Sequence, residues 1–202
     1  LVADTPYMGM ELANPDSPLL TQPPQNAETL LNYLVPILEG LSHAHARGIT
    51  HRDLKPSNIL QFGREKTLKL VDFGRAQIFS TPEGLDQQRR SGGTPRYVAP
   101  EQFESRNRDC GPWTDLYSLA CFVWEWVAGP PVFSNRSLFQ LIHAHLHESP
   151  PALNPQFPVP KGFEAWLRKN LAKDFRTRFL SASDALNDLL RLFDTVRPPS
   201  SR

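Results

Sequence analysis

A chain of 202 residues is long enough to bury the core of one domain, and its 40% hydrophobic and 21% charged residues are typical of soluble globular proteins. The formal net charge of +1 gives no electrostatic reason to expect nucleic acid or a membrane surface as the main partner. Two cysteines supply neither a disulfide framework nor the spacing of a metal site, so we expect a reducing compartment, the cytoplasm.

Strand signals occur in two pairs, with a helical signal between them. The first pair covers 1–3 and 7–12 around the turn sequence Asp-Thr-Pro. Over 27–47, apolar residues recur every three or four positions, which predicts a helix that a proline should bend. The second pair covers 58–62 and 67–71 around Gly-Arg-Glu-Lys and predicts a short hairpin.

Two more helices are predicted in the second half of the chain. Residues 115–127 are nearly all apolar, which is typical of a helix buried on every side. The longest apolar stretch, 116–133, contains a glutamate and a Pro-Pro pair, so we expect no membrane span within this segment. Ser181 and Asp184 form a capping-box pattern that begins a last helix reaching Phe193. The predicted fold class is α+β, mostly helical, with a little β structure near the start.

The two ends of the sequence favour a segment of a longer protein. The chain begins with Leu1 rather than Met and shows no signal-peptide pattern. Residues 196–202, "VRPPSSR", are typical of the first part of a flexible linker. A membrane anchor of the parent protein beyond residue 202 stays an open alternative.

The stretch "HRDLKPSNIL" (51–60) concentrates charged and amide side chains in a predicted loop, where they can serve chemistry rather than packing. Asp53 offers a carboxylate that can orient a hydroxyl and accept its proton. Lys55 offers a point charge for a phosphate, and Asn58 an oxygen ligand for a hard cation. Asp72, in "VDFG", follows the predicted second strand of the hairpin and adds another oxygen ligand.

Three motifs in this order resemble the protein kinase family. His51–Asn58 is similar to the kinase catalytic loop, Asp72–Gly74 to the metal-binding motif, and Ala99–Glu101 to the end of the activation segment. Lys55, two residues after Asp53, is similar to the Ser/Thr rather than the tyrosine kinase pattern. Among kinases, the chain is most similar in character to bacterial eukaryotic-like Ser/Thr kinases. The resemblance implies a protein-kinase-like fold, protein substrates, and ATP and Mg2+ as cofactors.

The resemblance also implies a division of the chain. Residues 1–13 would be the end of the small lobe and the hinge, 14–195 the mostly helical large lobe, and 196–202 the start of a linker. The sequence contains no Gly-rich loop and no strand lysine, both of which kinases carry in the small lobe. We therefore expect a small lobe upstream in the parent chain, and negligible kinase activity from residues 1–202 by themselves.

Catalytic roles follow from the resemblance residue by residue. Asp53 would accept the proton of a substrate Ser or Thr hydroxyl, and Lys55 would steady the γ-phosphate of ATP. Asn58 and Asp72 would hold Mg2+. His51 is expected to be a packed residue beneath Phe73 rather than a general base.

A nucleotide site is implied near the start of the chain. Met10 would be the gatekeeper, and the backbone from Glu11 to Ala13 would contact adenine. Leu60 would form part of the adenine floor, and Asp72 would complete the nucleotide site through the metal.

Further residues are given structural roles by the resemblance. Asp115 would hold the backbone of the catalytic loop by hydrogen bonds, and Arg178 would pair with Glu101. Thr94 belongs to "GTPRYVAPE" (93–101), which is similar to the substrate-docking segment of Ser/Thr kinases.

A regulatory role is implied for Arg52, which in the family pairs with a phosphate on the activation segment. Ser91, flanked by two arginines, is a candidate phosphosite. Ser80 and Thr81 are the alternatives, and position alone does not choose among the three.

One alternative function remains open, a non-catalytic, pseudokinase-like module that binds partner proteins. It is favoured only by the missing small lobe. Intact Asp53, Asn58 and Asp72 favour the enzyme, because a scaffold has no chemical use for a base and two metal ligands. A small-molecule kinase is a more distant alternative.

Overall fold

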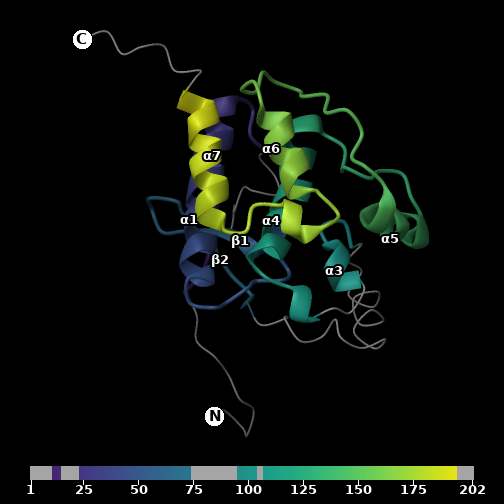
Figure 1. Cartoon of the computed structure of the whole chain (residues 1–202). Coiled ribbons are helices and arrows are strands. Elements are labelled where there is room, and N and C mark those ends of the chain that lie inside the picture. Colours follow the sequence, from purple (N-terminus) through teal and green to yellow (C-terminus); the bar gives the residue numbers. More distant parts are fainter. Residues whose placement is uncertain (1–10, 15–22, 74–94, 104–106, 195–202) are drawn as a thin grey trace, which may run out of the picture.

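A computed structural model of the chain describes residues 11–14, 23–73, 95–103 and 107–194 (Figure 1). The fold is mostly helical with one two-stranded sheet, as the sequence predicted. In chain order the elements are α1 (Ala27–His45), η1 (Pro56–Asn58), β1 (Ile59–Phe62), β2 (Thr67–Leu70), α3 (Pro100–Phe103), η4 (Asn107–Asp109), α4 (Pro112–Ala128), α5 (Leu138–His147), α6 (Phe163–Asn170), η5 (Phe175–Thr177) and α7 (Ala182–Asp194).

Helix α4 is the central element, and helices α1, α6 and α7 pack around it (Figure 1). It begins at Pro112 rather than at residue 115. Gly111 caps this end by donating its backbone N–H to Thr114 Oγ1 at 3.1 Å, and Pro112 has no backbone N–H that the first turn would leave unbonded. Most of its side chains are buried, as the apolar run predicted. Within the part of the chain that the structure describes, no helix is both long enough and apolar enough to cross a membrane.

Helix α1 lies alongside α7 and closes one side of the core (Figure 1). Asn26 caps it by accepting the backbone N–H of Thr29 at 2.9 Å. Its apolar face is buried at the helical spacing that the sequence showed. At its far end, Ser42 Oγ lies 2.6 Å from Ser183 Oγ of α7. The predicted helix 27–47 is thus confirmed, with its end at His45.

The β1–β2 hairpin follows directly after the catalytic-loop motif, which ends at Asn58. Its strands are antiparallel, with Ile59 opposite Leu70 and Phe62 opposite Thr67, which confirms the predicted hairpin to within a residue at each end. Gly63, with a φ of 68°, adopts the left-handed conformation at the start of the turn, which glycine favours. Strand β2 packs against α1, so the hairpin is fixed to the helical body.

Of the two strands predicted at the start of the chain, the structure describes only the last two residues. Residues 1–10 lie outside the described residues, and with them the strand 1–3 and most of 7–12. Glu11 and Leu12 are in neither helix nor strand, so the strand prediction is wrong for them. Their neighbour Asn14 instead donates its backbone N–H to the carbonyl of Gln61 at 2.8 Å, a contact between a loop and β1.

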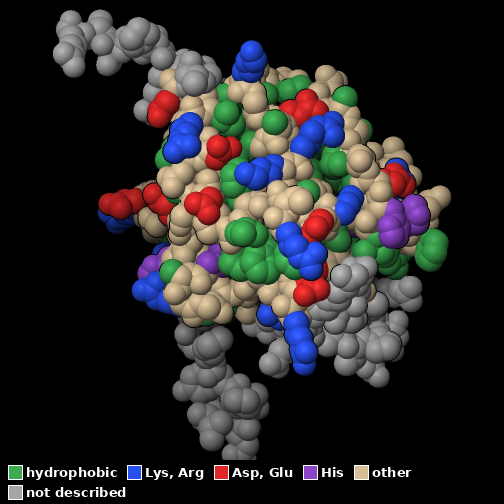
Figure 2. Space-filling model, in the orientation of Figure 1, with side chains coloured by type: hydrophobic (Ala, Val, Ile, Leu, Met, Phe, Trp, Pro, Cys, Tyr) green, Lys and Arg blue, Asp and Glu red, His purple; other side chains and the backbone are tan. Residues whose placement is uncertain are grey.

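After α4, the described chain forms helices α5, α6 and α7 and the short η5, joined by loops. Ser181 Oγ accepts the backbone N–H of Asp184 at 3.0 Å, which confirms the predicted cap of α7. Helix α5 stands at the edge of the molecule, away from α1 and α7 (Figure 1). Basic and acidic side chains are mixed over the face that carries α6 and α7 (Figure 2).

Candidate active site

Asp115 of α4 organises the loop that contains Asp53. Its side chain is fully buried and accepts the backbone N–H groups of His51 at 2.8 Å and of Arg52 at 2.7 Å. His45 at the end of α1 donates from Nε2 to the same carboxylate at 2.8 Å. Arg52 adopts a φ of 61°, which a non-glycine residue keeps only where its surroundings enforce it. The central helix therefore fixes the loop backbone directly before Asp53.

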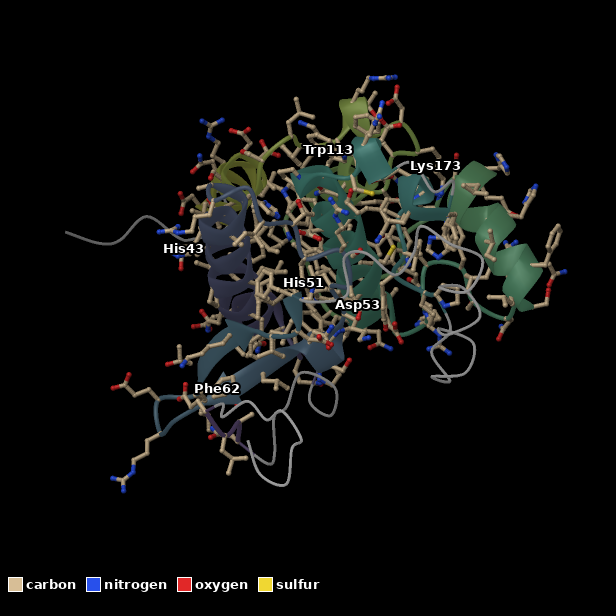
Figure 3. All side chains as sticks on the ribbon, turned by 90° about the horizontal axis from the view of Figure 1, so that it is seen from below. His43, His51, Asp53, Phe62, Trp113 and Lys173 are labelled. Carbon is tan, nitrogen blue, oxygen red and sulfur yellow. The ribbon has the colours of Figure 1, made fainter. Side chains whose placement is uncertain are left out.

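Asp53, Lys55 and Asn58 form one cluster at the base of the hairpin. Lys55 Nζ donates to Asp53 Oδ2 at 2.8 Å. Asn58 Nδ2 donates to the Asp53 carbonyl at 2.8 Å and to its Oδ2 at 3.3 Å. Figure 3 shows Asp53 beside His51, where the hairpin meets the helical body. Both neighbours hold the Asp53 carboxylate through one oxygen, so Oδ1 is the oxygen that can serve another group.

Asp72 is brought beside this cluster by backbone contacts. Val71 donates its N–H to the carbonyl of Asn58 at 2.9 Å, and its own carbonyl accepts from His51 Nε2 at 2.9 Å. Asp72 follows with an exposed side chain and a φ of 65°. The ring of Phe73 packs on that of His51, with centroids 4.6 Å apart, and His51 is fully buried. His51 is thus a packed residue that ties the segment of Asp72 to the loop, as the sequence analysis expected.

The predicted nucleotide residues are only partly covered by the structure. Met10 lies outside the described residues. Glu11 is exposed and pairs with Lys69 of β2, while Ala13 is half-buried. Leu60 is half-buried on β1. Sequence reasoning missed Asn14, whose Nδ2 donates to the carbonyl of Gly63 at 3.0 Å and so anchors this segment to the hairpin turn.

Gln102 is a second residue that sequence reasoning missed. Its Nε2 donates to the Arg52 carbonyl at 2.7 Å, and its Oε1 accepts the N–H of Ala99 at 3.0 Å. It therefore joins the "APE" motif to the catalytic loop. An amide directly after the motif was the only signal in the sequence. Ser91 and Thr94, with the alternative phosphosites 80 and 81, lie outside the described residues.

Glu101 and Arg178 form a buried ion pair below the loop. The guanidinium donates to both carboxylate oxygens, at 2.8 and 2.9 Å, and the two side chains are 4% exposed or less. Thr114 Oγ1 also donates to Glu101 at 2.8 Å. Such a two-pronged pair has a defined geometry, so it fixes α3 relative to the segment after α6.

A hollow of about 200 Å³ opens next to Pro56 of the catalytic loop. Tyr97 and Glu125 line it and are joined by a hydrogen bond of 2.8 Å from the phenol to the carboxylate. Burial, and then the adjacent Glu125, raises the pKa of Tyr97 far above its usual value. Ser118 donates to the Tyr97 carbonyl at 2.6 Å, so α4 positions this segment as well as the loop.

Comparisons with known proteins place the chain in a family. Residues 3–191 match the model of the protein kinase domain. The serine/threonine-protein kinase PknD of Mycobacterium tuberculosis is 39% identical over 73% of this chain, and PkaA of Streptomyces coelicolor is 39% identical over 66%. PknB of Mycobacterium leprae is 29% identical over 97% of the chain.

The matched region is a fraction of each relative. It covers 22% of PknD, 25% of PkaA and 32% of PknB. The family match, by contrast, takes in nearly all of this chain, including every residue of the cluster around Asp53. The chain therefore belongs to the protein kinase domain family.

Proposed function

We propose that the parent protein is a protein serine/threonine kinase, which transfers the γ-phosphoryl group of ATP to Ser or Thr hydroxyls of protein substrates. The observation that carries this proposal is the cluster in which Lys55 and Asn58 hold Asp53 while Val71 sets Asp72 beside them. Phosphoryl transfer asks a protein mainly for positioning and charge neutralisation, and this cluster supplies groups for both.

Asp53 would orient the substrate hydroxyl and accept its proton. Oδ2 is held by Lys55 and Asn58, which leaves Oδ1 for the hydroxyl. Lys55 and Asn58 hold the carboxylate itself, and Asp115 holds the backbone directly before Asp53. Lys55, whose side chain is 31% exposed, would move its charge to the γ-phosphate when ATP is present.

Asn58 and Asp72 fit a magnesium site. The amide nitrogen of Asn58 is committed to Asp53, so its oxygen is the atom left for a cation, and Asp72 presents an exposed carboxylate. Oxygen ligands of this kind are those that Mg2+ takes. Bound magnesium would neutralise negative charge on the phosphoryl oxygens.

The nucleotide would lie along β1 and the segment 11–14. Leu60 would contact the adenine face, and the backbone from Glu11 to Ala13 would bond its edge, with Met10 beside it. The contacts of Asn14 to β1 and the hairpin turn support a fixed position for this segment. Arg52 would receive a phosphate placed on Ser91 or a neighbouring hydroxyl.

A non-catalytic module that binds partner proteins is the second candidate. Among the described residues, the feature that a partner could use is the hollow at Tyr97, which Phe122 and Trp126 also line. Such a module does not account for a buried network built around Asp53, because a scaffold needs no oriented carboxylate there. We therefore favour the enzyme.

The test uses the full-length natural protein, γ-labelled ATP, Mg2+ and a mixture of candidate substrate proteins. The wild type and Asp194→Asn, an exposed control at the end of α7, should label Ser and Thr equally well. Asp53→Asn should lower the initial rate by about 10²-fold or more. Equal labelling by all three proteins, or by none, would contradict the proposal.

A further inference from the structure

A carboxylate lines the hollow that opens beside the catalytic loop. The hollow, of about 200 Å³, is bounded on one side by Pro56, which directly follows Lys55 of the candidate active site. Glu125, near the end of α4, also lines it, and its side chain is 27% exposed. The roles proposed for the loop do not use this carboxylate. An acidic group is thus open to an incoming molecule beside the loop that would act on a substrate hydroxyl.

The two oxygens of Glu125 have different neighbours. Oε2 accepts a hydrogen bond from the phenol of Tyr97 at 2.8 Å, which orients the carboxylate. Oε1 lies 3.9 Å from Nη1 of Arg96, a distance too long for a hydrogen bond. The Arg96 side chain is 49% exposed, so water competes for this contact and the ion pair is weak. Oε1 can therefore exchange Arg96 for a cation that binds more closely.

The walls of the hollow fit an aliphatic chain that ends in a cation. They include the aromatic side chains of Tyr97, Phe122 and Trp126, and the Phe122 and Trp126 rings pack edge to face with their centres 5.0 Å apart. Aromatic rings attract cations and also pack well on the methylene groups that precede a charged end. The lining thus combines one negative charge with an apolar surface around it.

Contacts between two loops fix the outer edge of the hollow. Gly129 ends α4 with a φ of 89°, and a side-chain carbon placed on it would lie 2.4 Å from Nε2 of Gln156. Gln156 donates its backbone N–H to the carbonyl of Val127 at 2.8 Å. Both Gly129 and Gln156 line the hollow. The hollow is therefore formed before a ligand arrives, which lowers the cost of binding.

We propose that the hollow is a recognition subsite for an arginine side chain of the protein substrate, which binds Glu125 Oε1 in place of Arg96. The proposal rests on the proposed function, because a kinase brings a substrate segment to this loop. A guanidinium bonds a carboxylate through paired N–H groups and stacks on aromatic rings, which the ammonium of lysine does less well. Arg96 acts as an internal substitute that pairs with the carboxylate while no substrate is bound.

The first experiment measures substrate selection by the full-length natural protein with Mg2+ and labelled ATP. Peptides with one Ser acceptor carry, at each flanking position in turn, arginine or its neutral analogue citrulline. At one position, arginine should raise kcat/KM about fivefold over citrulline. Glu125→Gln, whose amide oxygen can still accept from Tyr97, should abolish the difference. Glu39→Gln, at an exposed carboxylate of α1, is the matched control and should keep it.

Two results of this scan would overturn the subsite. One is a ratio of arginine to citrulline near one at every position for the wild type. The other is a preference for arginine that survives unchanged in Glu125→Gln, because the carboxylate would then not be the group that reads it.

The second experiment tests the part played by Arg96. Arg96→Gln removes the internal cation from an exposed position, so the advantage of arginine over citrulline should rise by about twofold to fivefold. In the double variant Arg96→Gln/Glu125→Gln this gain should vanish, because no carboxylate is left to be freed. An unchanged ratio in Arg96→Gln would show that Arg96 does not compete for the subsite.

Binding separates the subsite from the proposed function. The same peptide scan with Ala in place of the acceptor Ser gives dissociation constants by fluorescence anisotropy, without any phosphoryl transfer. The Kd should be about fivefold lower for the arginine peptide than for the citrulline peptide in the wild type, and equal for both in Glu125→Gln. This difference without phosphorylation would support the subsite and contradict the proposed function. Equal Kd values in the wild type, with both Ser peptides phosphorylated, would overturn the subsite and leave the kinase.

Discussion

Arg178 and Glu101 meet across 77 positions of the chain and bury their charges against each other, with two N–H···O bonds of 2.8 and 2.9 Å. Arg178 also donates to the carbonyl of Trp113 at 3.2 Å, at the start of α4. The guanidinium thus joins three elements beneath the candidate active site. A pair of this kind fixes an arrangement because either charge alone would be costly to bury.

Removing the cation should therefore destabilise the protein strongly. Arg178→Met leaves Glu101 buried without its partner, and we expect the free energy of unfolding to fall by about 3–5 kcal/mol. Urea denaturation measures the loss. Arg176→Met, at a side chain that is 75% exposed, is the matched control and should change stability by less than about 0.5 kcal/mol. A similar small effect of both substitutions would show that the buried pair is not what holds α3.

Asp115→Asn should impair the catalytic loop even where the fold survives. An amide accepts only through its one oxygen and is neutral, so one of the N–H groups of His51 and Arg52 loses its acceptor and the other keeps only an uncharged one. We expect a loss of about 2 kcal/mol in unfolding free energy and a fall in kcat that exceeds any rise in KM for ATP. Steady-state kinetics and urea denaturation on the same preparation separate the two effects. Wild-type kcat in Asp115→Asn would contradict the role given to this carboxylate.

Stability should depend on pH through His145. Burial, and then the nearby Lys173, lowers its pKa to about 3 in the folded protein, against about 6.5 when unfolded, so the unfolded chain binds more protons between these values. Stability is therefore full above pH 6.5 and is lost as the pH falls toward 3, with a slope of up to about 1.4 kcal/mol per pH unit.

The check is urea denaturation at several pH values for wild type and two variants. His145→Gln should flatten the slope between pH 6.5 and 4. His147→Gln, at an exposed position of the same helix, should keep the wild-type slope. Parallel slopes in all three proteins would mean that His145 does not resist protonation.

Asp72 and Asp53 should differ in how their loss affects the metal requirement. If Asp72 holds magnesium, Asp72→Asn should raise the Mg2+ concentration for half-maximal activity by about tenfold. Asp53→Asn should lower kcat with a much smaller shift in that concentration. Mg2+ titrations of the residual activity of each variant measure this. A Mg2+ dependence left unchanged by Asp72→Asn would remove Asp72 from the metal site.

The sequence predicted those parts of the fold that depend on local patterns. Helix α1, the hairpin and α7 were predictable because spacing, turn residues and the Ser181 cap are properties of neighbouring residues. The start of α4 was predicted too late because Pro112 and the Gly111–Thr114 cap were not taken as its first turn. Helix α6, with eight residues, has too short a pattern to stand out.

Residues that act over long distances could not be predicted in the same way. The motifs identified Asp53, Asn58 and Asp72, but Gln102 contacts the Arg52 carbonyl 50 positions away. Glu125 is an ordinary glutamate of the apolar helix in the sequence, and its place in the hollow arises only when Tyr97 packs against α4. Such roles depend on three-dimensional contacts that no local spacing encodes.

The most direct test of the central claim compares binding with transfer in Asp53→Asn of the full-length protein. Asp53 is held beside the proposed metal ligands, but its proposed role is to act on the substrate hydroxyl, so Mg-ATP affinity should stay within about threefold of wild type. Single-turnover phosphoryl transfer should fall by about 10²–10⁴-fold. Transfer at the wild-type rate with Mg-ATP bound equally well would contradict the role of Asp53 and the proposed site with it.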